Sequence, residues 1–290
     1  MWLQRLKGSP YRFLLLSIVI FAIFYVYPII DTFRLSFYTF PMTNIGNQRF
    51  VGFQNFFEVF GSGRLYHTTI LTLEWTVTSV VGSMLFGLGI ALLLSEEFPG
   101  RGLVRTLILA PWIFPELVGA SMWKITMNSE YGLLGNIILP AFGFRGSLLS
   151  SPETAIFACS IVRIWKLTPF VALMCLAGIQ AIEVELYEAA SLDGAGSFNK
   201  FRHITIPQLS PVLLVALILA TVWTANQFDI VYILTRGGPG DATKIAVVDI
   251  YSLAFIENSA GIAQAEAVVF VIALIVISAL YYRGMRGKQS

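Results

Sequence analysis

Long apolar runs recur along the chain at intervals that predict membrane-spanning helices. An α-helix needs about 20 apolar residues to cross the hydrocarbon core of a bilayer, and about six runs here reach that length. They cover residues 11–30, 68–94, 103–127, 154–182, 211–231 and 263–282. Polar and turn-forming residues separate them. The pattern therefore predicts an all-α integral membrane fold with about six transmembrane helices, in a single transmembrane domain over residues 1–290.

Composition supports this prediction. The chain has 290 residues, of which 56% are hydrophobic and 12% are charged. A soluble domain usually carries about a quarter charged residues, so much of this surface is expected to face lipid. The net charge of +2 is small. No basic run with interleaved aromatic residues lies in a water-facing segment, so a nucleic-acid partner is not expected.

The residues that usually carry covalent chemistry or bind metals are few and scattered. Cys159 and Cys175 fall on one predicted helix, roughly 24 Å apart at 1.5 Å per residue, so they cannot form a disulfide there. His67 and His203 have no Cys, Asp or Glu cluster around them at metal-ligand spacing. No pair of nucleophile and base is evident. We therefore expect no catalytic residue and no metal site on this chain.

The positions of Lys and Arg predict the orientation of the chain. One set lies at the two ends and after the second and fourth spans, all on one side of the membrane: Arg5, Lys7, Arg12, Arg101, Arg105, Lys200, Arg202, Arg283, Arg286 and Lys288. The opposite loops hold Arg34, Arg49, Arg64, Arg145, Arg236 and Lys244, so the bias is modest. It favours a multi-pass protein of a bacterial-type plasma (inner) membrane with both termini cytoplasmic. The first apolar run is expected to stay as a signal-anchor helix.

The cytoplasmic segment 183–207, between the fourth and fifth spans, has the pattern of a helix-turn-helix. Residues 182–191 suit a short helix, and Gly194 suits a sharp turn because glycine tolerates a positive φ. Ser197 is expected to cap a second short helix, which Pro207 ends. Small residues in the segment allow close approach of another protein. On composition alone, a simple loop that reverses the chain direction fits this segment as well as a docking element does.

The order of residues in segment 183–207 resembles the cytoplasmic signature of importer permeases of the ATP-binding-cassette (ABC) class. The matching positions are Glu188-Ala189-Ala190, Gly194, Ile204, Ile206 and Pro207, with Ile206 standing where Leu is commoner. Shorter stretches, in the same order along the chain, resemble the maltose-type carbohydrate-uptake family. These are Val51–Phe56, Pro111-Trp112, Pro115, Trp123, Tyr131-Gly132, Trp165–Phe170 and Thr235–Pro239.

The resemblance implies a permease that works with other subunits. Such a permease has six core helices and is assembled with a second permease, which we expect to be non-identical, two ATP-binding-cassette subunits and an extracytoplasmic solute-binding protein. The chain has no G-x-x-x-x-G-K-[ST] phosphate loop, so ATP and Mg²⁺ are expected on the ATPase subunits and no cofactor on this chain. The implied coupling helix lies in segment 183–207. Contact with the ATPase is expected at Glu188, Ala189, Ala190, Asp193, Gly194, Phe198, Phe201 and Pro207.

The resemblance also implies where a solute passes. It places solute-contacting positions on Trp165, Phe170, Asn226 and Asp229, whose aromatic faces, amide and carboxylate suit a hydroxyl-rich solute. Arg163 is a further candidate, because polar residues inside spans usually face a cavity or a partner. The expected function is ATP-driven import of a sugar or related polyhydroxylated solute by alternating access.

Several interpretations stay open at these positions. Arg163 either lines the pathway or pairs internally with Asp229 or Glu116. Trp112, Trp123 and Trp223 suit a membrane-interface belt or helix packing better than solute contact. Ala225 stands where the family carries an aromatic residue. The solute is therefore unnamed: mono-, di- and oligosaccharides, polyols and osmolytes fit, and a phosphorylated or acidic solute fits if Arg163 or Lys166 faces the pathway.

Two other classes of protein compete with the importer. An ion-gradient-driven secondary transporter would use Asp229, Glu74 and Glu116 as proton or cation sites. A non-transporting membrane scaffold would need none of these residues for solute uptake. The signature in segment 183–207 favours the importer over both.

Overall fold

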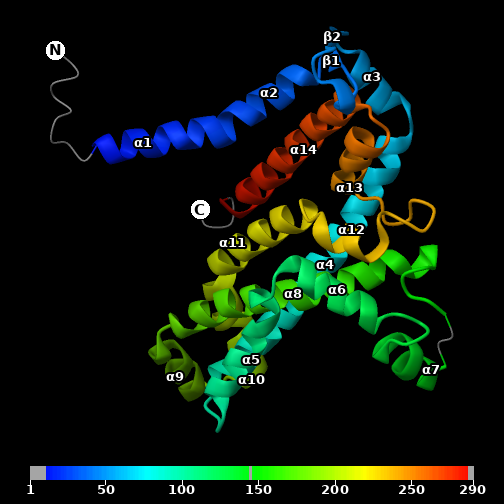
Figure 1. Ribbon diagram of the computed structural model, residues 1–290. Helices are drawn as coiled ribbons and strands as arrows, with labels where there is room; N and C mark the ends of the chain where they lie inside the picture. Colours follow the sequence, from blue (N-terminus) through cyan, green and yellow to red (C-terminus); the bar gives the residue numbers. More distant parts are fainter. Residues whose placement is uncertain (1–10, 144–145, 287–290) are drawn as a thin grey trace, which may run out of the picture. The chain divides into compact units, whose positions relative to one another are not determined.

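The computed structural model describes residues 11–143 and 146–286 (Figure 1). Arg5, Lys7, Arg145 and Lys288, which enter the orientation argument, lie outside these ranges. Five helices are long and apolar enough to cross a membrane, or six if one sharply bent pair counts as a single span. The prediction of an all-α fold with about six spans is confirmed.

The described chain divides into two compact units. The first comprises Met1–Leu65 with Ile250–Ala273, and the second comprises Tyr66–Asp249 with Leu274–Ser290. The prediction of a single domain over residues 1–290 stays a prediction.

The first unit contains the first span and a small hairpin. Its elements are α1 (Tyr11–Phe21), the π-helical turn Ala22–Val26, α2 (Tyr27–Leu35), β1 (Tyr38–Thr39), the 3-10 turn Met42–Asn44, β2 (Arg49–Phe50), α3 (Gln54–Gly61), the π-helical turn Ser252–Ile256 and the first half of α14 (Ala260–Arg286). The strands pair antiparallel, with Tyr38 opposite Phe50. Arg64, the first residue of α4, forms an ion pair with Glu257, in which Nη1 donates to Oε2 at 2.8 Å.

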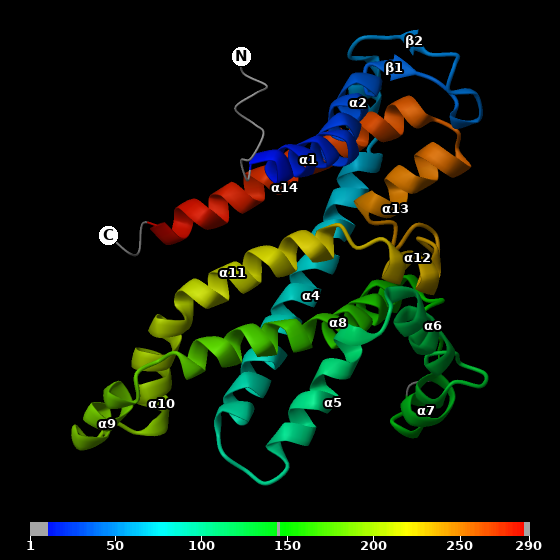
Figure 2. The same cartoon turned by 60° about the vertical axis from the view of Figure 1, so that its left-hand side comes forward.

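The second unit holds the remaining spans and the part of α14 from Leu274 onward. Its elements are α4 (Arg64–Ser95), α5 (Arg101–Ile113), α6 (Glu116–Thr126), the π-helical turn Leu133–Ile138, α7 (Leu139–Ala141), α8 (Pro152–Gln180), α9 (Val184–Leu192), α10 (Ser197–Lys200), the π-helical turn Phe201–Thr205, α11 (Ile206–Ala225), α12 (Asp229–Thr235) and α13 (Ala246–Tyr251). Of these, α4 begins and α13 ends in the first unit. Helix α8 packs beside α5 and α11 (Figure 2).

Small residues let α4 and α8 approach closely. A Cβ built on Gly87 of α4 would lie 2.6 Å from Cβ of Val171 and 3.1 Å from the backbone nitrogen of Ala172, both in α8. Two residues further along α4, a Cβ on Gly89 would meet nothing within 4 Å. Close helix packing through small residues is the usual way that membrane helices associate, because lipid offers no hydrophobic driving force between them.

Two predicted spans are interrupted in the structure. The third, predicted over residues 103–127, consists of α5 and α6, which meet at Phe114–Pro115 with a bend of 96°. Phe114, the residue before Pro115, has an extended backbone (φ −61°, ψ 138°), which is the conformation that a following proline favours, and α5 ends there. The fifth, predicted over residues 211–231, is helical to Ala225, breaks at residues 226–228 and resumes as α12.

The close crossing of α4 and α8 generates a prediction. Gly87→Ala should lower the free energy of unfolding of the purified protein by about 1–3 kcal/mol, because the new methyl group overlaps Val171 and a backbone nitrogen. Gly89→Ala is the matched control and should be neutral or slightly stabilising. Thermal unfolding in detergent compares the two. Equal loss of stability in both variants would show that the crossing is not as tight as described.

Candidate functional site

Two buried cations stand in the middle of α8. Arg163 and Lys166 are each only 4% exposed, although α8 is otherwise largely apolar. A charge buried in a membrane-spanning helix is costly unless it is hydrogen-bonded or paired. The surroundings of these two side chains therefore decide how the neighbouring helices are arranged. We call Arg163 and Lys166 the α8 cation pair.

Arg163 holds the end of α11. Its Nε donates to Oγ1 of Thr224 at 3.1 Å, and its Nη1 donates to Oε1 of Gln227 at 3.3 Å. Thr224 lies one residue before the end of α11, and Gln227 lies in the break that follows. The carbonyl of Thr224 also accepts a hydrogen bond from Nε1 of Trp75 in α4, at 2.9 Å. The end of α11 is thus fixed from two other helices.

Arg163 also reaches the start of α6. Its Nη1 lies 3.9 Å from Oε1 of Glu116, the first residue of that helix. A carboxylate at a helix N-terminus is favourable in itself, because the helix dipole is positive there. Arg163 thus connects α6, α8 and α11. Of the partners considered from the sequence, it is Glu116 that contacts Arg163. A pathway role for Arg163 stays a prediction.

Lys166 donates a hydrogen bond to the backbone at the break between α5 and α6. Its Nζ donates to the carbonyl oxygen of Phe114, the residue between α5 and α6. A similar contact lies further along α6, where Nζ of Lys124 donates to the carbonyl of Ile233 in the last turn of α12, at 2.6 Å. Carbonyls at a helix C-terminus have no partner within the helix, and the dipole there favours a cation. The lysines supply the donors that these carbonyls need in lipid.

The predicted solute contacts on α8 lie on two different sides of that helix. Trp165 packs edge-to-face on Trp123 of α6, with ring centroids 5.7 Å apart, and lines an apolar pocket of about 340 Å³ that includes Pro111. Phe170 packs on Trp223 of α11, with ring centroids 4.7 Å apart. Five residues along a helix correspond to a rotation of about 140°, which explains the separation. The structure does not bring Trp165 and Phe170 onto one face.

The predicted contacts on the fifth span both lie at its break. Asn226 is the residue after the end of α11, and Asp229 is the first residue of α12. Both are exposed. The Nδ2 of Asn226 donates to the carbonyl of Val222 at 2.9 Å, within its own helix end. An exposed amide and carboxylate beside a break can bind hydroxyl groups.

Sequence reasoning did not identify Thr224 and Trp75. A threonine hydroxyl in an apolar helix usually bonds its own helix, so Thr224 did not stand out. Trp75 lies within a long apolar span, where a tryptophan is readily taken for a packing residue. The available signal was the buried cation itself. An arginine inside a span requires acceptors, and the polar side chains of Thr224, Asn226 and Gln227 are one place in the chain that offers them.

Segment 183–207 folds into the expected pair of helices, with two differences. Helix α9 ends in a glycine turn: Ala195 N–H donates to Ala190 O at 2.9 Å, Gly194 N–H donates to Ser191 O at 3.1 Å, and Gly194 has φ +77°. The prediction that Ser197 caps the second helix is wrong. Gly196 is the residue before α10, no side chain caps that end, and Ser197 is the first helical residue.

The prediction that Pro207 ends the second helix is also wrong. The chain stays helical from Ser197 through a π-helical turn into α11, and Pro207 lies in the first turn of α11. The reason is the π-helical turn at residues 201–205. It takes up the register change at the point where proline supplies no N–H donor. Segment 183–207 is therefore continuous with the fifth span on its C-terminal side.

Segment 183–207 presents apolar and acidic side chains to solvent. Leu192 is 90% exposed and Phe198 is 70% exposed. The expected ATPase contacts are exposed at Glu188, Ala189, Asp193, Gly194, Phe198 and Pro207 and half-buried at Ala190 and Phe201. Large apolar side chains exposed beside carboxylates on a water-facing segment are typical of a protein-docking surface.

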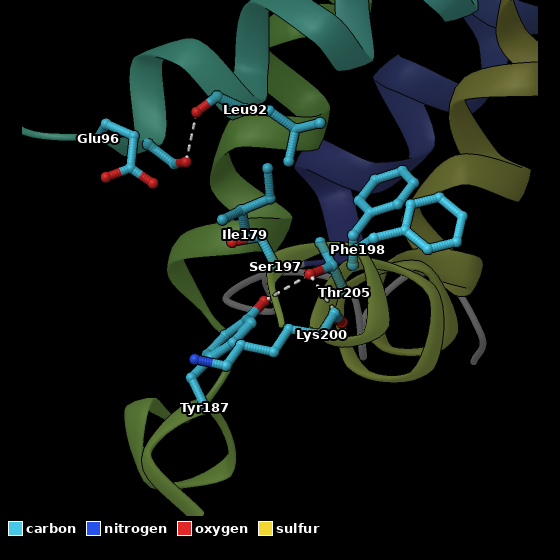
Figure 3. A pocket seen from close by; sticks show the side chains of 10 residues that line it. Leu92, Glu96, Ile179, Tyr187, Ser197, Phe198, Lys200 and Thr205 are labelled. Atoms are coloured by element: carbon cyan, nitrogen blue, oxygen red, sulfur yellow. Dashed lines mark hydrogen bonds between the residues drawn. The ribbon is translucent and has the colours of Figure 1, made fainter. Parts of the chain in front are cut away.

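Internal hydrogen bonds stiffen segment 183–207. The hydroxyl of Tyr187 lies 2.9 Å from Oγ1 of Thr205 (Figure 3). The Nζ of Lys200 donates to Oγ of Ser191 at 2.6 Å. Together these bonds join α9 to α10 and the π-helical turn. A pocket of about 710 Å³ separates the segment from the end of α4, where Ser95 and other residues line it. The segment is thus held mainly by its own contacts and by its two chain connections.

Comparisons with known proteins give one consistent result. The family model for binding-protein-dependent transport system inner membrane components matches residues 83–286. The trehalose/maltose transport system permease protein MalF of Thermococcus litoralis is 41% identical over 234 residues, which cover 80% of this chain and 79% of that protein. The sulfoquinovosyl glycerol transport system permease protein SmoG of Agrobacterium fabrum is 36% identical over 277 residues, covering 95% and 88%.

A solved structure shares the fold. A chain of the bacterial alginate ABC transporter, in complex with an alginate pentasaccharide-bound periplasmic protein, superimposes with a TM-score of 0.80 and 24% sequence identity. The match covers 93% of this chain and 91% of that one. At this identity the likeness shows the fold alone.

The α8 cation pair generates a prediction. Lys166→Met should lower the free energy of unfolding by about 1–2 kcal/mol, because the carbonyl of Phe114 loses its donor at the break between α5 and α6. Lys166→Arg, which keeps a charged donor, should recover part of that loss. Thermal unfolding of both variants checks this. A methionine variant as stable as the wild type would contradict the role given to Lys166.

Proposed function

This chain belongs to the family of binding-protein-dependent transport system inner membrane components, and from that premise we propose that it forms half of the solute pathway in an importer of sugars or related polyhydroxylated solutes. The chain is a multi-pass membrane permease subunit of an ATP-driven importer, and ATP hydrolysis takes place on a separate subunit. Membership of this family argues against the two alternatives, an ion-gradient-driven secondary transporter and a non-transporting membrane scaffold.

The sugar assignment rests on what the relatives carry. One is named for trehalose and maltose, another for sulfoquinovosyl glycerol, and the solved transporter of like fold binds a periplasmic protein loaded with an alginate oligosaccharide. All of these contain sugar rings with several hydroxyl groups. The exposed amide of Asn226 and carboxylate of Asp229, at the break between α11 and α12, offer the hydrogen-bonding groups that such rings need.

Segment 183–207 is the proposed coupling element. The proposal rests on the structure of this segment, in which two short helices are joined by a turn at Gly194 and stiffened by internal hydrogen bonds. Leu192 and Phe198 are exposed at its surface. A stiff element transmits displacement. Because it runs without a helix end into α11, a movement of the segment reaches the break at residues 226–228. Alternating access then follows as a rigid-body shift driven by the ATPase.

The proposed assembly has further members. A second, non-identical permease completes the pathway, two ATP-binding-cassette subunits bind ATP and Mg²⁺, and an extracytoplasmic solute-binding protein delivers the solute. The chain lies in the plasma membrane with both termini cytoplasmic. Membership of a family of binding-protein-dependent inner membrane components supports the solute-binding protein and the membrane location.

The coupling role of segment 183–207 is testable at one carboxylate. Glu188→Ala should lower solute-stimulated ATP hydrolysis of the purified complex by about tenfold, which corresponds to roughly 1.4 kcal/mol of coupling. The removed carboxylate is exposed and is expected to meet a basic residue of the ATPase. Glu185→Ala is the matched control, three residues earlier on the same helix and outside the signature, and should retain most of the activity. Equal activity in the two variants would overturn the role of Glu188.

The pathway role of the α11–α12 break is testable at Asn226. Asn226→Ala should raise the concentration of trehalose or maltose needed for half-maximal uptake by about fivefold, since a hydrogen bond contributes about 1 kcal/mol. Basal ATP hydrolysis should not change. The control is Asn136→Ala, an exposed asparagine in the π-helical turn Leu133–Ile138. An unchanged concentration dependence in Asn226→Ala would remove this residue from the pathway.

A further inference from the structure

Helix α3 presents three phenyl rings on one face. Phe53, immediately before the helix, is 63% exposed, and Phe57 and Phe60 are 76% and 64% exposed. Spacings of four and three residues place them within about 60° of one another around the helix axis. Single exposed apolar residues are common, but a stripe of three aromatic side chains on a short helix is an unusual exposed surface. We call these three residues the phenyl face.

The opposite face of α3 is fixed to the first unit. Asn55 is 3% exposed, and its Nδ2 donates to the carbonyls of Ser36 at 2.8 Å and Tyr38 at 2.9 Å. Val59, four residues later, is 4% exposed. Because these contacts set the rotation of α3 about its axis, the phenyl face cannot turn inward. Figure 1 shows α3 beside the β1–β2 hairpin that carries one of these carbonyls.

Both chain connections place α3 at the boundary of the membrane. The first span, Leu14–Leu35, ends shortly before it, and the second, Arg64–Ser95, begins shortly after it. The residues between them connect two spans on one side of the bilayer. Only residues 62–63 separate α3 from the second span, and on its other side Asn55 of α3 bonds the carbonyl of Ser36, the residue that follows α2. Held at the ends of both spans, α3 lies close to the lipid headgroups.

Ring contacts join the phenyl face to the first span. The ring of Phe33, in α2, lies 5.5 Å from that of Phe37, which lies 5.2 Å from Phe53. The most apolar window of this first span is 0% buried within the chain. The phenyl face therefore continues an apolar surface that already faces outward at membrane depth. Gln54 and Glu58 lie to the side of the phenyl face, where polar side chains reach water.

We propose that α3 is an interfacial helix whose phenyl face inserts into the leaflet at which α2 ends. Amphipathic helices with Phe, Trp or Leu on one face bury that face about 5–10 Å deep, at the boundary between headgroups and acyl chains. The occupant of this surface is bilayer lipid. The phenyl face anchors the first unit at a fixed depth in the membrane.

Depth-dependent fluorescence quenching tests the proposal. A bimane label is attached at Phe57→Cys or Phe60→Cys in the full-length protein, reconstituted in nanodiscs with the subunits that copurify. The native thiols of Cys159 and Cys175 are buried, and unsubstituted protein measures any background labelling. Lipids with a nitroxide near the carbonyl end of the acyl chain should quench both labels about threefold more than aqueous iodide does, as the depth of an interfacial helix requires.

Glu58→Cys is the matched control. It is one residue from Phe57 but about 100° away around the helix, and its label should be quenched by iodide rather than by lipid. Two results would overturn the proposal. Equal iodide quenching at positions 57 and 58 means that the phenyl face lies in water. Protection of positions 57 and 60 from both quenchers means that another protein subunit covers it.

Discussion

The second unit depends on the burial of two cations in α8. Neither Arg163 nor Lys166 can leave the apolar surroundings of its helix, and both need acceptors there. Unbroken membrane helices have no free carbonyls to offer, because every backbone group is bonded within the helix. At the break between α5 and α6, the backbone carbonyl of Phe114 accepts a hydrogen bond from Lys166. At the end of α11 and in the break that follows, the side chains of Thr224 and Gln227 accept hydrogen bonds from Arg163.

This arrangement places the breaks where a transporter can use them. The break between α11 and α12 carries the exposed Asn226 and Asp229, while Arg163 holds the buried side of the same stretch. Segment 183–207 lies at the other end of the same fifth span and continues into α11. In the proposed importer, displacement of that segment by the ATPase therefore moves a helix whose far end is tied to α8. Asn226, the predicted pathway residue at that far end, moves with it.

Much of this could be predicted from the sequence, and the rest depends on contacts between distant residues. Apolar runs of sufficient length predicted the spans, and the ordered residues from Glu188 to Pro207 indicated the family. Pro115 was visible in the sequence, but a proline within a span predicts a bend without its size. The end of α11 at Ala225 follows neither proline nor glycine. It depends on Arg163, which lies about 60 residues earlier in the chain. Pro207 was wrongly predicted to end a helix, because a π-helical turn before it lets the helix continue.

A double-mutant cycle between Arg163 and Thr224 tests the central claim most directly. The free energy of unfolding is measured for the wild type, Arg163→Met, Thr224→Val and the double variant. If Arg163 fixes the end of α11, the two changes are not additive, and the coupling energy is about 1 kcal/mol, near the upper part of the range found between membrane helices. Strict additivity would contradict the claim. The break between α11 and α12 would then be held by something other than the α8 cation pair.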